Sequence, residues 1–170
     1  MGDAGLFANE RVELLDGTIV TMAPQSPPHA GTVVRLHRAL MRAIGKAADV
    51  RMQPPIVIDD WSEPEPDVIV CQPDPYDYTR EHPRPDQILL VAEVAVSSLS
   101  YDRGRKAKAY ARAGIAEYWI IDVGNRRIEI RRDPDTTAAR YRVVAIAREG
   151  DRLPTLGGET VAVDDVLPPR

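Results

Sequence analysis

The sequence has little of several features that would assign a protein to a well-defined class. Its single cysteine, Cys71, cannot form a disulfide within the chain, so a small disulfide-stapled fold is excluded. No run approaches the roughly 18 to 20 apolar residues that a membrane-spanning helix needs. Residues 1–11 lack the basic region and following apolar run of a secretory signal. These absences lead us to expect a cytoplasmic protein without a membrane partner.

The motifs of several enzyme classes are also missing. His29 and His37 lie eight residues apart and His82 falls in a predicted loop, so the sequence shows no zinc-binding spacing. No serine or cysteine lies in a nucleophile elbow, which argues against acyl hydrolysis. No glycine-rich loop follows a predicted strand, which makes a doubly wound nucleotide-binding fold the less favoured architecture.

Charge is unevenly distributed along a chain of net charge −4. The 170 residues, 44 % of them hydrophobic, are enough for one domain with a buried core. Residues 57–101 contain ten acidic and two basic side chains, whereas residues 102–142 contain eleven basic and six acidic ones. A metal-holding centre beside a phosphate-contacting surface would have this pattern, but solvated loops that differ in sign would give it equally well.

The amino-terminal half predicts a hairpin and a long helix. Residues 12–15 and 18–22 flank Asp16-Gly17, a dipeptide suited to a two-residue hairpin turn. Residues 29–47 have the helical spacing of an amphipathic helix, with basic residues on the opposite face. Its apolar stripe contains Val33, Leu36, Leu40, Ile44 and Ala47.

The remainder predicts a mixed sheet with helices on both faces. An edge or bent strand is expected over residues 50–58, interrupted by two prolines, and an apolar strand is expected after Asp67. Further strands are expected at 88–96, 117–123, 127–131, 141–147 and 159–163. The segment Ser97-Ser98-Leu99-Ser100 can cap a helix that runs from about 101 to 113 and stops at Gly114. The strand–helix–strand unit between Val91 and Tyr118 indicates a parallel pair with a right-handed crossover. We therefore predict one α/β domain over residues 1–170, with a core at about 12–132 and a C-terminal β extension at 133–170.

Two carboxylates lie where apolar strands are predicted. Glu93 is near the end of the apolar run 88–96, and a buried carboxylate needs a basic partner or a metal ion because its desolvation is costly. Asp67 follows Pro66 at the start of another apolar strand, and Lys106 lies on the later helix. If the two strands are neighbours, Asp67 and Glu93 converge, and such a pair suits a hard cation such as Mg²⁺ or Mn²⁺.

With these residues in view, the chain resembles the PD-(D/E)XK nuclease superfamily, whose core motif is Pro-Asp, a spacer and then Glu-x-Lys. Pro66-Asp67 and Glu93-Val94-Ala95 match this motif, with alanine in place of the lysine. More narrowly, the chain is similar to a bacterial family of restriction endonucleases that is abundant in cyanobacteria. The matching segments are Val12-Glu13-Leu14-Leu15-Asp16-Gly17, Pro64-Glu65-Pro66-Asp67-Val68, Ala92-Glu93-Val94, residues 101–106 and residues 110–122.

The resemblance implies a restriction-endonuclease-like fold and a role for each acidic residue. Asp67 and Glu93 would be the metal ligands, and Glu13 from the first hairpin would complete the metal shell. In that family the missing lysine comes from the following helix, where Lys106 matches, four residues after Asp102. The resemblance further implies Mg²⁺ or Mn²⁺ as the cofactor, DNA as the substrate and a homodimer as the assembly.

Two functions remain open at this point. The first is a metal-dependent endonuclease that hydrolyses phosphodiester bonds, most readily those of DNA. The alternative is a catalytically attenuated module that keeps the nuclease fold and binds nucleic acid or a protein partner, which Ala95 and the negative net charge favour. Each residue also has a structural interpretation: Glu93 and Lys106 can form a buried ion pair without a metal, and Asp102 can serve a helix dipole.

Overall fold

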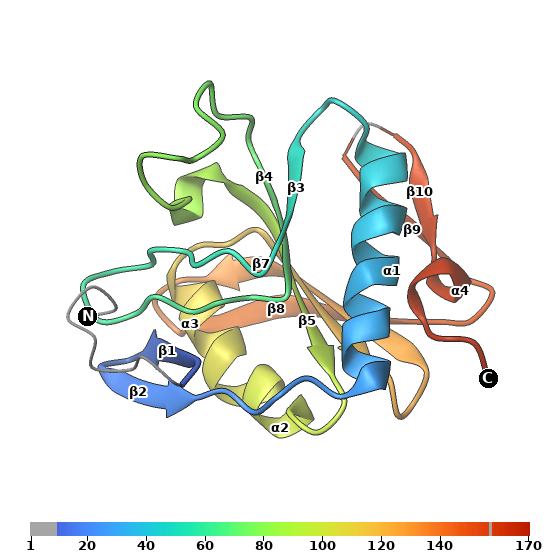
Figure 1. Ribbon diagram of the computed structural model, residues 1–170, viewed down its shortest axis with the longest axis horizontal. Helices are drawn as coiled ribbons and strands as arrows, with labels where there is room; N and C mark the ends of the chain where they lie inside the picture. The colour runs from blue at the N-terminus through green and yellow to red at the C-terminus, as the bar shows by residue number, and fades with distance from the viewer. Residues whose placement is uncertain (1–9, 157) are drawn as a thin grey trace.

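A mixed six-stranded sheet forms the centre of the computed structural model, which describes residues 10–156 and 158–170 (Figure 1). Its order is β3-β4-β5-β6-β7-β8, and every neighbouring pair is antiparallel except β5 and β6. The strands are β3 (Asp49–Met52), β4 (Val68–Cys71), β5 (Ile88–Ala95), β6 (Glu117–Asp122), β7 (Arg127–Asp135) and β8 (Arg140–Arg148). The predicted α/β fold and the predicted parallel pair are both confirmed, since Val91 lies opposite Tyr118.

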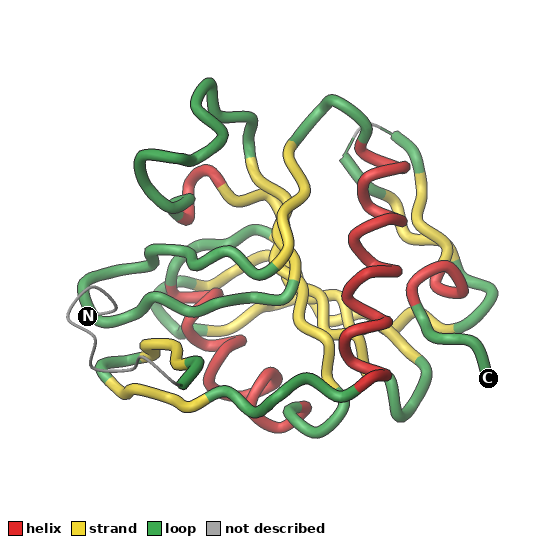
Figure 2. Tube along the Cα trace, in the orientation of Figure 1, coloured by secondary structure: helices red, strands yellow, loops and turns green. Residues whose placement is uncertain are grey.

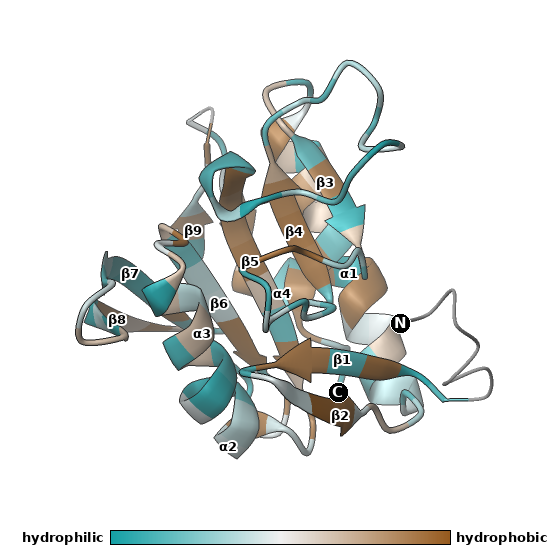
Figure 3. Ribbon diagram, turned by 90° about the vertical axis from the view of Figure 1, so that its left-hand side faces the viewer, coloured by the Kyte–Doolittle hydropathy of each residue, from teal (hydrophilic) through white to brown (hydrophobic). Residues whose placement is uncertain are grey.

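Strand β5 is buried on both faces because helices cover both sides of the sheet. Leu90, Ala92 and Val94 belong to the core beneath helix α1 (Pro27–Ile44), which contributes Val33, Leu36 and Leu40. The intervening residues Val91 and Ala95 belong to a second core on the opposite face. Figure 3 shows β4 and β5 as largely hydrophobic strands in the middle of the sheet. Glu93 lies between Val91 and Ala95, so the period of two along the strand directs it toward the second core.

The segment after β5 is helical but not uniformly α-helical. It consists of α2 (Leu99–Tyr101), a π-helical turn η3 (Asp102–Lys106) and α3 (Ala107–Arg112). The predicted end at Gly114 is observed, and its φ of 77° is a conformation that glycine adopts without steric cost. The prediction of one regular helix over 101–113 missed the π turn, where the Ala107 N–H donates to the Asp102 carbonyl.

The amino-terminal hairpin is separate from the main sheet. Strands β1 (Val12–Leu15) and β2 (Thr18–Thr21) pair across Asp16 and Gly17, both of which have positive φ, as such a turn requires. The Leu14 N–H donates to the Glu63 carbonyl, and the Gly17 N–H donates to the Trp61 carbonyl. These hydrogen bonds connect the hairpin to the loop between β3 and β4. Figure 2 shows this loop as extended green tubes beside the hairpin.

The C-terminal residues divide between two structures. Strand β8 joins the main sheet as its edge, whereas β9 (Arg152–Pro154) and β10 (Thr160–Ala162) form a separate two-stranded ribbon. Helix α4 (Val163–Val166) follows and packs against α1 (Figure 1). Before β4, the strand expected over residues 50–58 ends at Met52, because the chain turns at Gln53, whose φ is 52°, and the prolines after it cannot donate to a ladder.

A short helical turn, η2 (Pro85–Gln87), leads into β5.

No helix among the described residues is long and apolar enough to cross a bilayer. The prediction that the first eleven residues carry no secretory signal concerns mainly residues 1–9, which lie outside the described residues.

Candidate functional site

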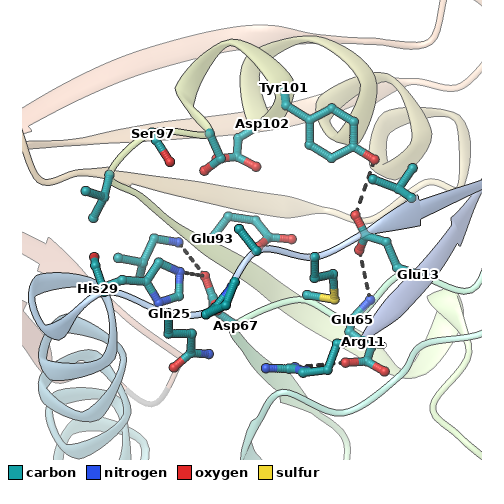
Figure 4. Close-up of a pocket in the computed structure, with 18 of the residues that line it drawn as sticks. Arg11, Glu13, Gln25, His29, Glu65, Asp67, Glu93, Ser97, Tyr101 and Asp102 are labelled. Atoms are coloured by element: carbon teal, nitrogen blue, oxygen red, sulfur yellow. Dashed lines mark hydrogen bonds and ion pairs between the residues drawn. The ribbon is translucent and has the colours of Figure 1, made fainter. Parts of the chain in front are cut away.

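A cavity of about 320 Å³ lies where the start of α1, the end of β5, the β1–β2 hairpin and the η3 turn meet (Figure 4). The four residues predicted from the sequence all line it, namely Glu13, Asp67, Glu93 and Lys106. They come from β1, the residue before β4, β5 and the end of η3. Residues that are 93 positions apart in the chain therefore border one space.

Glu93 is a buried carboxylate on β5 that shares one of its oxygens between two donors. Its Oε1 accepts hydrogen bonds from Lys106 Nζ at 2.8 Å and from the Tyr110 hydroxyl at 2.7 Å. Among the described residues, none donates to its other oxygen, Oε2. The motif position Ala95 is buried in the second core, and the cation that reaches Glu93 comes from the helix instead.

Asp67 is held at the opening of β4 by donors from two elements. Its Oδ2 accepts the Val94 N–H at 2.8 Å and lies 3.1 Å from Nε2 of His29, on the first turn of α1. Its Oδ1 has only a 3.4 Å contact with the Gln53 side chain. The hydrogen bond to Val94 crosses from β4 to β5, so the predicted proximity of the two strands places Asp67 beside the residue that follows Glu93.

Glu13 has a different environment, because both its oxygens accept hydrogen bonds. Oε1 accepts from the Tyr101 hydroxyl at 3.2 Å, and Oε2 accepts from the Glu65 N–H at 3.2 Å. Lys106 Nζ also lies 3.3 Å from Oε2. Glu13 is thus a second anchor for Lys106, and its place in a metal shell stays a prediction.

Asp102, whose place near a helix start suits the helix dipole, is a fourth buried carboxylate at the cavity. It is buried at the start of η3, and its Oδ2 accepts a 2.6 Å hydrogen bond from the Ser98 hydroxyl. Figure 4 shows its side chain on the same side of the cavity as Tyr101, facing Glu93.

Among the described residues, five carboxylates line the cavity, and Glu65 is paired with Arg11. The four buried ones, of Glu13, Asp67, Glu93 and Asp102, have Lys106 as the one lysine among them, which leaves the site short of positive charge. Burial raises the pKa of Glu93 to about 8, which Lys106 opposes and the nearby Asp67 reinforces. Burial also raises the pKa of Asp102. Burial alone would lower the pKa of Lys106, but Glu93 and Glu13 outweigh it, so the pKa lies above its ordinary value and the ammonium stays charged.

The arginines that follow along the chain do not form a free basic surface. Arg103 contacts Glu129 and Asp122, whose carboxylates are buried on β7 and β6. Arg127 and Arg131 bind the same two carboxylates. Arg112 pairs with Asp16 and Arg132 with Glu117. The basic block of the sequence is therefore largely neutralised within the fold.

The carboxylate oxygens at this cavity fit a hard divalent cation whose remaining ligands are water and substrate phosphate. Within residues 10–156 and 158–170, no three His, Cys, Asp or Glu side chains are arranged to hold a metal ion by themselves. Asp67 and Glu93 nevertheless each offer an oxygen with no donor or only a distant one, beside uncompensated negative charge. Mg²⁺ is commonly bound by one or two carboxylates together with water and substrate phosphate, which matches this arrangement.

Two comparisons bear on identity. Residues 6–164 match the sequence profile of the Uma2 family, described as "Putative restriction endonuclease". The fold is similar to the crystal structure of a "putative nuclease belonging to DUF820" from Anabaena variabilis ATCC 29413, with a TM-score of 0.70 and 10 % sequence identity. That similarity covers 91 % of this chain and 88 % of the other. No curated protein matches the sequence. Because the family profile spans nearly the whole chain, the protein belongs to the Uma2 family.

Proposed function

We propose that the protein is a metal-dependent endonuclease that hydrolyses phosphodiester bonds of DNA. The observation that carries the proposal is a pair of carboxylates, Asp67 and Glu93, with open oxygens facing one cavity beside a buried lysine. The family description and the nuclease-like fold support it.

Asp67 and Glu93 are the residues that would hold Mg²⁺ or Mn²⁺, with Glu13 as a further candidate ligand. The ion, when bound, would polarise a phosphoryl oxygen and lower the pKa of an attacking water. The protein's own contribution is placement: the Val94 N–H and His29 fix Asp67, and Lys106 fixes Glu93.

Lys106 acts as a permanent cation in this proposal. Its raised pKa keeps it protonated at neutral pH, so it is suited to neutralise charge that develops on phosphate and unsuited to serve as a general base. Its ammonium reaches the site from η3 although the motif position on β5 is alanine.

One observation favours a second function, a nuclease-fold module that binds without cutting. The arginines at 103, 112, 127, 131 and 132 contact carboxylates of their own chain, which leaves fewer cations for a nucleic-acid backbone. A module of this kind would have no need of a divalent ion at Asp67 and Glu93.

Thermal unfolding with and without metal separates the two functions. We expect millimolar Mn²⁺ to raise the Tm of wild type and to leave Glu93→Ala unchanged, because ligand at 100 times its Kd stabilises by about 2.7 kcal/mol. Supercoiled plasmid cleavage under the same conditions then tests the activity. Equal metal shifts in wild type and Glu93→Ala would favour the binding module.

A further inference from the structure

Tyr110 is a buried side chain for which the proposed chemistry provides no role. It lies on α3, one helical turn after Lys106, and is 0 % exposed. Its ring meets that of Tyr118 edge-on, with centroids 5.0 Å apart. Its hydroxyl does not bind a backbone carbonyl but donates to Oε1 of Glu93 at 2.7 Å.

The Tyr110 hydroxyl and Lys106 bind the same oxygen of Glu93. Together they occupy Oε1 at 2.7 and 2.8 Å, whereas no described residue donates to Oε2. A carboxylate held this way cannot rotate to exchange its oxygens without losing two hydrogen bonds inside a buried site. A tyrosine hydroxyl carries a proton at neutral pH, so Tyr110 is the donor in this hydrogen bond.

We propose that Tyr110 is a positioning residue of the metal site: by tying Oε1 of Glu93, it presents Oε2 to the cavity as the oxygen that takes the divalent cation. The inference rests on the proposed function, since it assumes that Glu93 binds metal. Hydrogen-bonded groups behind a metal ligand commonly change metal affinity by about 10- to 100-fold when they are removed.

Tyr141 provides a matched control within the same core. It is also buried, its ring lies near Tyr118, and its hydroxyl donates to a backbone carbonyl, that of Ile115, at 2.9 Å. Tyr110→Phe and Tyr141→Phe therefore each remove one buried hydroxyl and keep the ring. Only the former removes a donor from a metal-facing carboxylate.

The test is Mn²⁺ titration calorimetry on wild type, Tyr110→Phe and Tyr141→Phe. We expect the Kd for Mn²⁺ to rise about tenfold or more in Tyr110→Phe and to stay at the wild-type value in Tyr141→Phe. Calorimetry gives stoichiometry separately from Kd, so a partly unfolded variant shows fewer sites while its folded fraction still reports the affinity.

The remaining outcomes distinguish the positioning role of Tyr110 from the metal site itself. If wild type and Tyr110→Phe bind Mn²⁺ equally, the positioning role is wrong and the metal site stands. If both tyrosine variants weaken binding to the same extent, the effect is one of core packing and the positioning role is again wrong. If wild type does not bind Mn²⁺, the metal site itself is absent, and both proposals fail.

Discussion

Glu93 and Glu129 are both buried glutamates, yet their surroundings shift their pKa values in opposite directions. Glu93 shares its one cation, Lys106, with Glu13, so burial outweighs the ion pair and the pKa rises to about 8. Burial acts on Glu129 in the same sense, but hydrogen bonds from Arg103 and Arg131 outweigh it and its pKa falls. Glu93 therefore lacks the surplus of cations that surrounds Glu129.

The raised pKa of Glu93 predicts that metal affinity depends on pH. Protonation of this carboxyl competes with the cation, so we expect the affinity for Mn²⁺ to fall as the pH is lowered from 8 to 6. Calorimetric titration at several pH values measures this change, with Glu93→Gln as the variant that should not bind. A Kd that is constant over this range would contradict the prediction.

The acidic pair could be predicted at the scale of single residues, but its supporting side chains could not. Asp67 stands at the start of one apolar strand and Glu93 near the end of another, and the two positions converge if the strands are neighbours, as β4 and β5 are. His29 contacts Asp67 from a helix 38 positions earlier, and no sequence spacing reports that contact. The position of Tyr110 could have been predicted, because it lies four residues after Lys106 on the same helical face.

At the scale of elements, side chains of the η3 turn contact different partners. Lys106 points to Glu93, whereas Arg103 in the same turn reaches Glu129 on β7. The arginine contacts hold this turn against the sheet and so help to place the lysine. The sequence predicts a helix that ends at Gly114, as observed. Serines at its start and glycine at its end do not distinguish an α turn from a π turn between them, so the sequence did not predict η3.

Glu129→Gln tests how strongly this contact holds the turn. Because the pKa of Glu129 is lowered in the folded state, its stabilisation is present above its ordinary pKa of 4.5 and is lost as the pH falls through the folded value. We expect the variant to lose about 2 kcal/mol at pH 7, the worth of hydrogen bonds to a charged group, and less at pH 3. Urea unfolding at both pH values measures the difference.

The exposed Glu159 provides the control, since Glu159→Gln should change the free energy of unfolding little at either pH. A loss in Glu129→Gln of the same size at pH 3 and pH 7 would show that the carboxylate's charge is not what stabilises the turn.

At the scale of the whole molecule, β8 forms the long edge of the main sheet, with no strand paired to its outer side among the described residues. Strand β8 is nine residues long, and its side chains Val143, Val144 and Ile146 are 48 %, 52 % and 37 % exposed. An apolar edge strand offers unpaired backbone groups to another chain. If the protein is a homodimer, as the family resemblance implies, we expect β8 to lie at the interface.

Val144→Lys tests this assembly. A lysine on each copy would place like charges together at a β8–β8 contact, so we expect the sedimentation mass to change from dimer to monomer. Val34→Lys, at an exposed position of α1, should leave the mass unchanged. A monomeric wild type, or a dimer that survives Val144→Lys, would contradict the prediction.

The long separation in sequence between Glu13 and Lys106 also sets the order in which the site can assemble during synthesis. The four buried carboxylates, those of Glu13, Asp67, Glu93 and Asp102, leave the ribosome before the lysine beside them. Strand β5 gains its parallel neighbour only when Glu117–Asp122 has followed. A nascent chain that ends before Lys106 holds the acidic groups without their cation, so the site can be completed only after Lys106 and Glu117–Asp122 have all been made.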